Sequence, residues 1–163
     1  MTATTFNTSN TVRDIMNLMV EANARQLWDA VSYVATAEGV QETLPQTDAD
    51  WQRLRAHAVA LIEAGNALML PGRLIDHPEN LDDYEEFMYT PAEIEQLIST
   101  DPESWAYNLQ EMQAATLLTL TAIDERDLLR FTEQAATINQ ACESCHAQYW
   151  YRPLPMQGAE GLR

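Results

Sequence analysis

The sequence predicts an all-α protein, an antiparallel four-helix bundle with a long connection between its second and third helices. Three observations favour this fold class. The 163 residues include only five glycines, apolar residues recur at helical spacing, and breaks rich in proline and acidic residues separate the periodic segments. Four amphipathic segments of about 20 residues or more are enough for one bundle. We expect a single domain over residues 1–163, with residues 1–9 and 154–163 frayed.

The first predicted helix covers residues 11–37. Thr11 is a suitable N-cap, because Asp14 follows at the third position as in a capping box. Gly39 comes shortly after the helix as a stop signal. The apolar stripe of this helix contains Val12, Met16, Met19, Leu27, Val31 and Val34.

The second predicted helix begins after Thr47, has Asp50 at its third position, and ends at the Pro-Gly pair of residues 71–72. Its buried face is expected to contain Trp51, Leu54, Ala58, Leu61, Ile62 and Leu68. Residues 72–89 then form the long connection. Their acidic run, interrupted by Pro78, disfavours a regular element.

The second half of the chain contains one short and two long predicted helices. The short helix, residues 90–99, opens with a threonine cap, a first-turn proline and an acid at the third position. The third long helix covers residues 101–123, and the fourth covers residues 124–151, before Pro153 ends the helical structure. Their inner faces contain Trp105, Leu109, Met112, Thr116, Leu120 and Ile123, and Leu128, Phe131, Ala135, Ile138, Cys142 and Cys145.

The charge balance excludes some classes of function. Nine basic residues, all of them arginine, stand against 25 acidic residues, for a formal net charge of −16. Repulsion therefore disfavours nucleic acid and anionic membrane surfaces, whereas a partner with a basic docking face would be complementary. The alternative is that the acidic surface serves only solubility. No apolar run approaches the roughly 20 residues that a membrane-spanning helix needs, and no Ser-His-Asp, phosphate-loop or paired-carboxylate pattern indicates an enzyme.

The main functional signal is the Cys-Glu-Ser-Cys-His segment, residues 142–146. Positions i, i+3 and i+4 share one face of a helix. Cys142 and Cys145 can therefore form thioethers to the two vinyl groups of one haem, while His146 supplies an axial nitrogen to the iron. Three alternatives are a redox dithiol, half of a zinc site, and two buried structural cysteines. Dithiols of the thioredoxin type follow a strand, and zinc usually takes four ligands, so both alternatives fit this segment less well.

A C-x-x-C-H motif near the C-terminal end of a four-helix bundle resembles the class II c-type cytochromes, cytochrome c prime and its low-spin relatives. The resemblance covers residues 10–152. Tyr149, three residues after His146, matches an aromatic position of the family. The family often has a basic residue directly after that aromatic, whereas this chain has Trp150 there and its arginine at Arg152. The resemblance implies one covalently bound haem c.

The resemblance also implies what lies opposite the proximal His146. In this family the first helix covers the distal face of the haem, where low-spin members place a methionine ligand and high-spin members an apolar residue. Matching the helices puts Met16 over the iron, with Met19 as an alternative ligand and core packing as the alternative for both. Arg13 suits a bidentate contact with a haem propionate, unless it is only a surface arginine near a helix start.

These inferences predict a periplasmic c-type cytochrome that carries single electrons by ferric/ferrous cycling and is not an enzyme. The alternative is a cytochrome c prime-like protein whose five-coordinate haem binds nitric oxide or carbon monoxide. Haem attachment normally takes place outside the cytoplasm, and no secretory signal is visible, so we expect the mature part of an exported protein. A redox partner protein is expected. Family members often form homodimers through their first two helices, but no residue pattern in this chain indicates whether it forms one.

Overall fold

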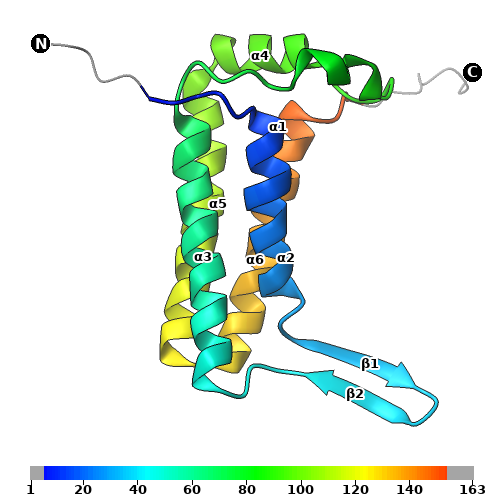
Figure 1. Ribbon diagram of the computed structural model, residues 1–163, viewed down its shortest axis with the longest axis vertical. Helices are drawn as coiled ribbons and strands as arrows, with labels where there is room; N and C mark the ends of the chain where they lie inside the picture. The colour runs from blue at the N-terminus through cyan, green and yellow to red at the C-terminus, as the bar shows by residue number, and fades with distance from the viewer. Residues whose placement is uncertain (1–5, 154–163) are drawn as a thin grey trace, which may run out of the picture.

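Four long helical stretches run side by side and antiparallel through the part of the chain that the structure describes, residues 6–153 (Figure 1). In this computed structural model, the side chains of residues 81–83 are not described. Residues 1–5 and 154–163 lie outside the described range. The predicted fraying of residues 1–9 and 154–163 falls mostly outside the described residues and stays a prediction.

The first stretch, residues 12–28, consists of α1 (Val12–Ile15), a π-helical segment η1 (Met16–Glu21) and α2 (Ala22–Trp28). The other three stretches are α3 (Asp48–Met69), α5 (Pro102–Glu125) and α6 (Leu128–Tyr149). The predicted N-caps are confirmed, because capping boxes begin α1, α3 and the short helix α4 (Pro91–Thr100). In each box the threonine hydroxyl accepts the N–H of the acid three residues on, and the acid accepts the N–H of the threonine.

The prediction of an all-α four-helix bundle is wrong. The first helical stretch ends at Trp28, and strands β1 (Ser32–Thr36) and β2 (Gly39–Thr43) form an antiparallel hairpin that projects from one end of the molecule (Figure 1). Two properties of the sequence explain the hairpin. Tyrosine, valine and threonine in β1 favour extended backbone, and Gly39 adopts a φ of 131°, which disfavours any residue with a side chain. The valines at positions 31 and 34 have helical spacing, and this spacing alone predicted a longer helix.

The residues between α3 and α5 cover the opposite end of the molecule (Figure 1). They include a 3-10 helix, η2 (Pro78–Asp83), and α4, which lies across the ends of the long helices. This end carries the candidate site described below. Within residues 6–153, no helix is both long enough and apolar enough to cross a membrane.

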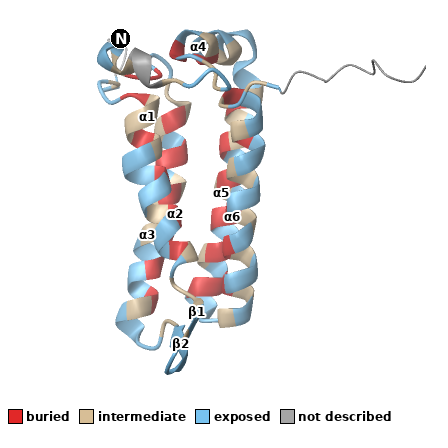
Figure 2. Cartoon of the chain, turned by 90° about the vertical axis from the view of Figure 1, so that its right-hand side faces the viewer, coloured by how far each residue is buried: buried red, intermediate tan, exposed pale blue. Residues whose placement is uncertain are grey.

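The core lies between the four stretches, whose buried residues face inward (Figure 2). Toward the hairpin end it is filled by large side chains. The ring of Trp51 meets that of Phe131 edge-on, with centroids 6.0 Å apart, and Leu54 and Ile123 are also buried. Toward the other end, the first stretch and α6 do not close on each other.

Candidate functional site

A cavity of about 390 Å³ lies between the first helical stretch on one side and α5 and α6 on the other. Its volume falls within the roughly 300–1,000 Å³ of small-molecule and cofactor pockets. Five residues that the sequence singled out line it together: Arg13, Met16, Cys142, Cys145 and His146. The first two come from the start of the chain and the other three from α6, so only the tertiary fold brings them together.

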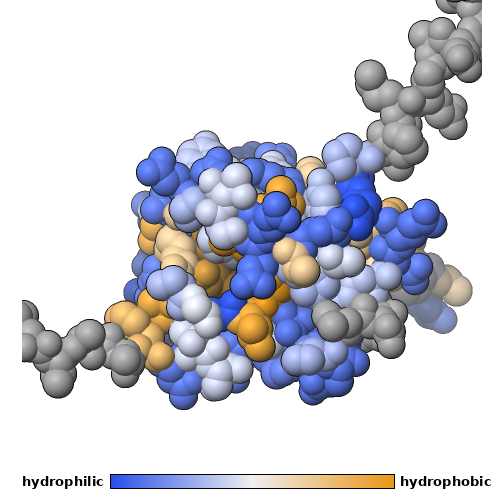
Figure 3. Space-filling view, turned by 90° about the horizontal axis from the view of Figure 1, so that it is seen from above, coloured by the Kyte–Doolittle hydropathy of each residue, from blue (hydrophilic) through white to orange (hydrophobic). Residues whose placement is uncertain are grey.

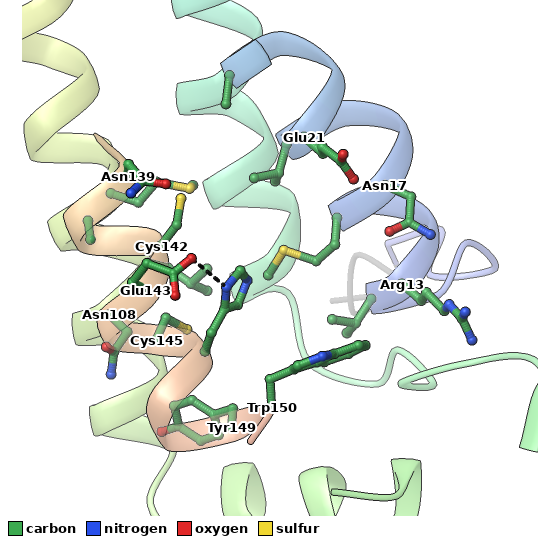
Figure 4. Close-up of a pocket in the computed structure, with 18 of the residues that line it drawn as sticks. Arg13, Asn17, Glu21, Asn108, Asn139, Cys142, Glu143, Cys145, Tyr149 and Trp150 are labelled. Carbon is green, nitrogen blue, oxygen red and sulfur yellow. Dashed lines mark ion pairs between the residues drawn. The ribbon is translucent and has the colours of Figure 1, made fainter. Parts of the chain in front are cut away.

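The two cysteines lie on the cavity side of α6 as free thiols (Figure 4). Burial raises the pKa of Cys142 to about 11, with a further contribution from the negative charge of Glu143. Burial likewise raises the pKa of Cys145 to about 12. Redox dithiols need a lowered thiol pKa, because the thiolate is the reactive form. This environment therefore disfavours the redox-dithiol alternative.

His146 also faces the cavity, and its side chain is 42% exposed. Its Nδ1 lies 3.7 Å from Oε1 of Glu143, the ion pair that the dashed line marks in Figure 4. This distance is longer than a hydrogen bond, so Glu143 places a negative charge beside the imidazole without holding it by a hydrogen bond. The sequence analysis missed this contact of Glu143, although its spacing of three residues from His146 on a helix was a usable signal.

Met16 lines the opposite wall of the cavity, whereas Met19 does not and is 36% exposed. The reason is the π-helical segment that begins at Met16. A π-helix has a wider turn than an α-helix, so residues three apart no longer share a face as they do at 3.6 residues per turn. The geometry thus favours Met16 over Met19. Such π segments are frequent at functional sites, and a helical period read from sequence does not reveal them.

Aromatic and aliphatic side chains form most of the remaining wall. The indole N–H of Trp28 donates to the carbonyl of Ala135 at 3.0 Å, and that of Trp105 donates to the carbonyl of Leu68 at 3.2 Å. Their polar atoms are therefore satisfied by backbone, and both side chains line the cavity. Further lining residues are Val20, Ala24, Ile94, Leu109, Met112, Tyr149, Trp150 and Tyr151.

Arg13 lies at the edge of the cavity, and in Figure 4 its side chain points away from the cysteines. Its Nη1 donates to Oδ2 of Asp76 at 2.6 Å, and the Asp76 side chain is only 1% exposed. Burial opposes the charged form of Asp76. Hydrogen bonds from Arg13, Asn80, Tyr84 and the backbone N–H of His77 outweigh burial and hold the pKa of Asp76 at about 2.

The contact of Arg13 with a haem propionate therefore stays a prediction. A propionate would compete with Asp76, which already binds the Arg13 guanidinium. Sequence reasoning missed Asp76, which lies 63 positions from Arg13 in a segment that was read as a solvated acidic loop.

The other two histidines lie outside the cavity lining. Nδ1 of His57 is 2.9 Å from Oδ1 of Asn23, and Nε2 of His77 is 2.9 Å from Oδ2 of Asp14. Both side chains are half-buried. Among the described side chains, those of residues 6–80 and 84–153, no group of three or more His, Cys, Asp or Glu is arranged to hold a metal ion.

Comparison of the chain with protein-family models, curated proteins and solved structures gives no match. The assessment of the site therefore depends on its chemistry. Two thiols at positions i and i+3 face the same apolar cavity as an imidazole, and a thioether lines the opposite wall. These groups are the usual attachment points and axial ligands of a c-type haem, so the residues present fit that cofactor.

Proposed function

We propose that this chain is a periplasmic electron carrier of the c-type cytochrome class, with one covalently bound haem, and is not an enzyme. One observation carries the proposal. Cys142, Cys145 and His146 line the same cavity as Met16, although these residues come from opposite ends of the sequence. A motif that occurred by chance would not require a cavity beside it or a second ligand across that cavity.

The residues have distinct roles in this proposal. Cys142 and Cys145 would hold the haem through thioether bonds, His146 would supply an imidazole nitrogen, and Met16 would supply a thioether sulfur. When bound, the haem would provide an iron that cycles between the ferric and ferrous states. The carboxylate of Glu143 lies on the Nδ1 side of His146, so Nε2 is the nitrogen that would be available to the iron.

The walls of the cavity control solvent access and polarity. Trp28, Trp105 and Leu109 present apolar surface to the cavity. A low local polarity and a thioether ligand both favour the ferrous state, which raises the reduction potential. The walls would also restrict movement of the His146 and Met16 side chains.

Binding of nitric oxide or carbon monoxide is a second candidate function. The wall that carries Met16 also contains the small apolar residues Val20 and Ala24, which leave room for a neutral diatomic gas. This function requires that the sulfur of Met16 does not bind the iron. The two candidate functions therefore differ in whether Met16 would be an iron ligand.

The test is export of the chain together with a haem-maturation system, followed by mass spectrometry and optical spectroscopy of the reduced protein with and without carbon monoxide. We expect one covalent haem and a low-spin spectrum that the gas does not change. Met16→Ala should make the spectrum sensitive to the gas. Met19→Ala is the matched control on the same helix and should leave it unchanged.

Absence of covalent haem would exclude both candidate functions. A high-spin spectrum that shifts with the gas in the unmodified protein would exclude Met16 ligation and favour gas binding.

A further inference from the structure

Two exposed aromatic side chains lie together at the end of the molecule that the residues between α3 and α5 cover. Phe87 is 55% exposed and Tyr151 is 42% exposed, and their rings stack with centroids 6.4 Å apart. Figure 3 looks onto this end and shows hydrophobic side chains gathered near its middle among hydrophilic ones. Apolar patches rimmed by polar residues often mark interaction sites.

Backbone hydrogen bonds hold this aromatic pair in place. The N–H of Arg152 donates to the carbonyl of Phe87 at 2.8 Å, and the N–H of Tyr89 donates to the carbonyl of Trp150 at 2.9 Å. Between these two bonds, residues 88 and 151 pair as an antiparallel bridge. The exposure of the two rings is therefore a fixed feature of the fold and does not come from a loose loop.

The aromatic pair is continuous with the candidate site. The ring of Tyr151 lies edge-on to the imidazole of His146, with centroids 6.3 Å apart, and Tyr151 also lines the cavity. A row of three rings thus leads from His146 through Tyr151 to Phe87 at the surface. Electron transfer between proteins slows steeply with distance, so a partner bound over these rings would be well placed.

The charge around the pair is negative. Glu85 and Glu86 directly precede the exposed phenylalanine, and Glu143 is exposed beside the histidine. The nearby Arg152 is already paired with Glu93, at 2.7 Å. Carboxylates at the rim of an interface steer a basic partner and raise its association rate, and weak redox complexes use small interfaces of this kind.

We infer that the end face formed by Phe87, Tyr151 and the carboxylates of Glu85, Glu86 and Glu143 docks a basic one-electron-transfer protein. This inference rests on the proposed electron-carrier function. A second copy of the chain is disfavoured as the occupant, because it would bring an identical acidic rim and a net charge of −16. A basic redox protein satisfies both the charge of the rim and the route to the cavity.

The experiment measures the second-order rate of electron transfer from the haem-loaded protein to mitochondrial cytochrome c, a basic redox protein, at low and at high ionic strength. We expect Glu85→Lys combined with Glu86→Lys to slow the reaction about tenfold at low salt and to have little effect at high salt. Phe87→Ala should slow it several-fold at both salt concentrations.

The matched control combines Glu38→Lys with Glu133→Lys. It makes the same change in net charge at exposed positions near the hairpin end, and we expect less than about a twofold effect. Equal effects of the two charge-reversal pairs, or no effect of either, would overturn the docking surface. A rate that rises when residues 154–163 are removed would do the same, because that segment would then be the occupant. So would a dimer that Phe87→Ala dissociates.

Failure of the electron-carrier function itself has a different signature. Each variant is first checked for covalent haem and for complete reduction by dithionite, a small reductant that needs no docking surface. A protein that lacks haem, or that dithionite does not reduce, contradicts the electron-carrier proposal and the docking surface with it. A protein with normal haem and normal reduction, whose rate does not depend on Glu85 and Glu86, contradicts the docking surface alone.

Discussion

The two ends of the helical core are packed in different ways. Toward the hairpin, Trp51 and Phe131 meet edge-on and Ile123 is only 2% exposed, so the helices are filled by side chains. Toward α4, the same helices enclose a cavity of about 390 Å³. Voids much larger than a water molecule are few in protein interiors, because their walls lose dispersion contacts. The filled end supplies stability, and the hollow end is suited to a bound group.

Truncation of one aliphatic side chain in each half of α5 compares the two regions most directly. Ile123 is 2% exposed in the filled region, whereas Leu109 is also 2% exposed but borders the cavity. We expect Ile123→Ala to lower the free energy of unfolding by about 4 kcal/mol and Leu109→Ala by about 2 kcal/mol in the haem-free protein, because Leu109 already lacks contacts on one side. Urea unfolding followed by circular dichroism measures both.

Haem should reduce the difference between these two variants. If a bound group fills the cavity, Leu109→Ala removes contacts to it and its effect on the loaded protein approaches that of Ile123→Ala. Equal effects of the two variants in the haem-free protein would mean that the two ends are equally well packed, contrary to the structure.

The hollow end also contains the buried ion pair of Arg13 with Asp76. We expect Asp76→Asn to lower the free energy of unfolding by about 3 kcal/mol at neutral pH, because it removes a buried charge-assisted network and leaves the guanidinium without that carboxylate. Asp124→Asn is the control, since it breaks an exposed pair with Arg55 and should change stability by less than about 1 kcal/mol. An effect of Asp76→Asn no larger than the control would show that the network is not stabilising.

Asp76 also makes the free energy of unfolding sensitive to acid pH. The folded-state pKa of Asp76 is about 2, below its ordinary value of 3.8, so the unfolded chain binds more protons between these values. Stability from this group is complete above about pH 4 and is lost as the pH falls toward 2. Asp76→Asn should flatten the fall in unfolding free energy over this window. Part of the fall in unfolding free energy should remain in this variant, because hydrogen bonds also lower the pKa values of Asp50 and Glu93 to about 2.

The smallest expected effect concerns the pair of Glu143 with His146. Glu143→Gln removes a negative charge near His146, the proposed iron ligand, and should raise the reduction potential of the haem-loaded protein by roughly 10–40 mV, the range for an exposed ion pair. Glu133→Gln, on the same helix near the filled end, is the control and should shift the potential less. A lower potential in Glu143→Gln would contradict the role of this carboxylate beside His146.

Features that depend on a few neighbouring residues were predicted correctly from the sequence. The capping boxes at Thr11, Thr47 and Thr90 are present, because a threonine and an acid three residues later need only each other to form one. The spacing of Cys142, Cys145 and His146 places them on one side of a helix for the same reason. The hairpin was missed because the helical spacing of two valines was weighed above the extended-backbone preference of residues 32–36.

Only the tertiary structure decided what lies opposite His146. Met16 faces the cavity and Met19 does not, because a π-helical segment changes the turn between them. Arg13 binds Asp76, and Phe87 stacks on Tyr151, across more than sixty positions of sequence. Local periodicity and capping are encoded within a turn or two of helix. Which residues face each other across the cavity depends on how segments that are distant in the sequence pack together. Patterns among neighbouring residues do not reveal this packing.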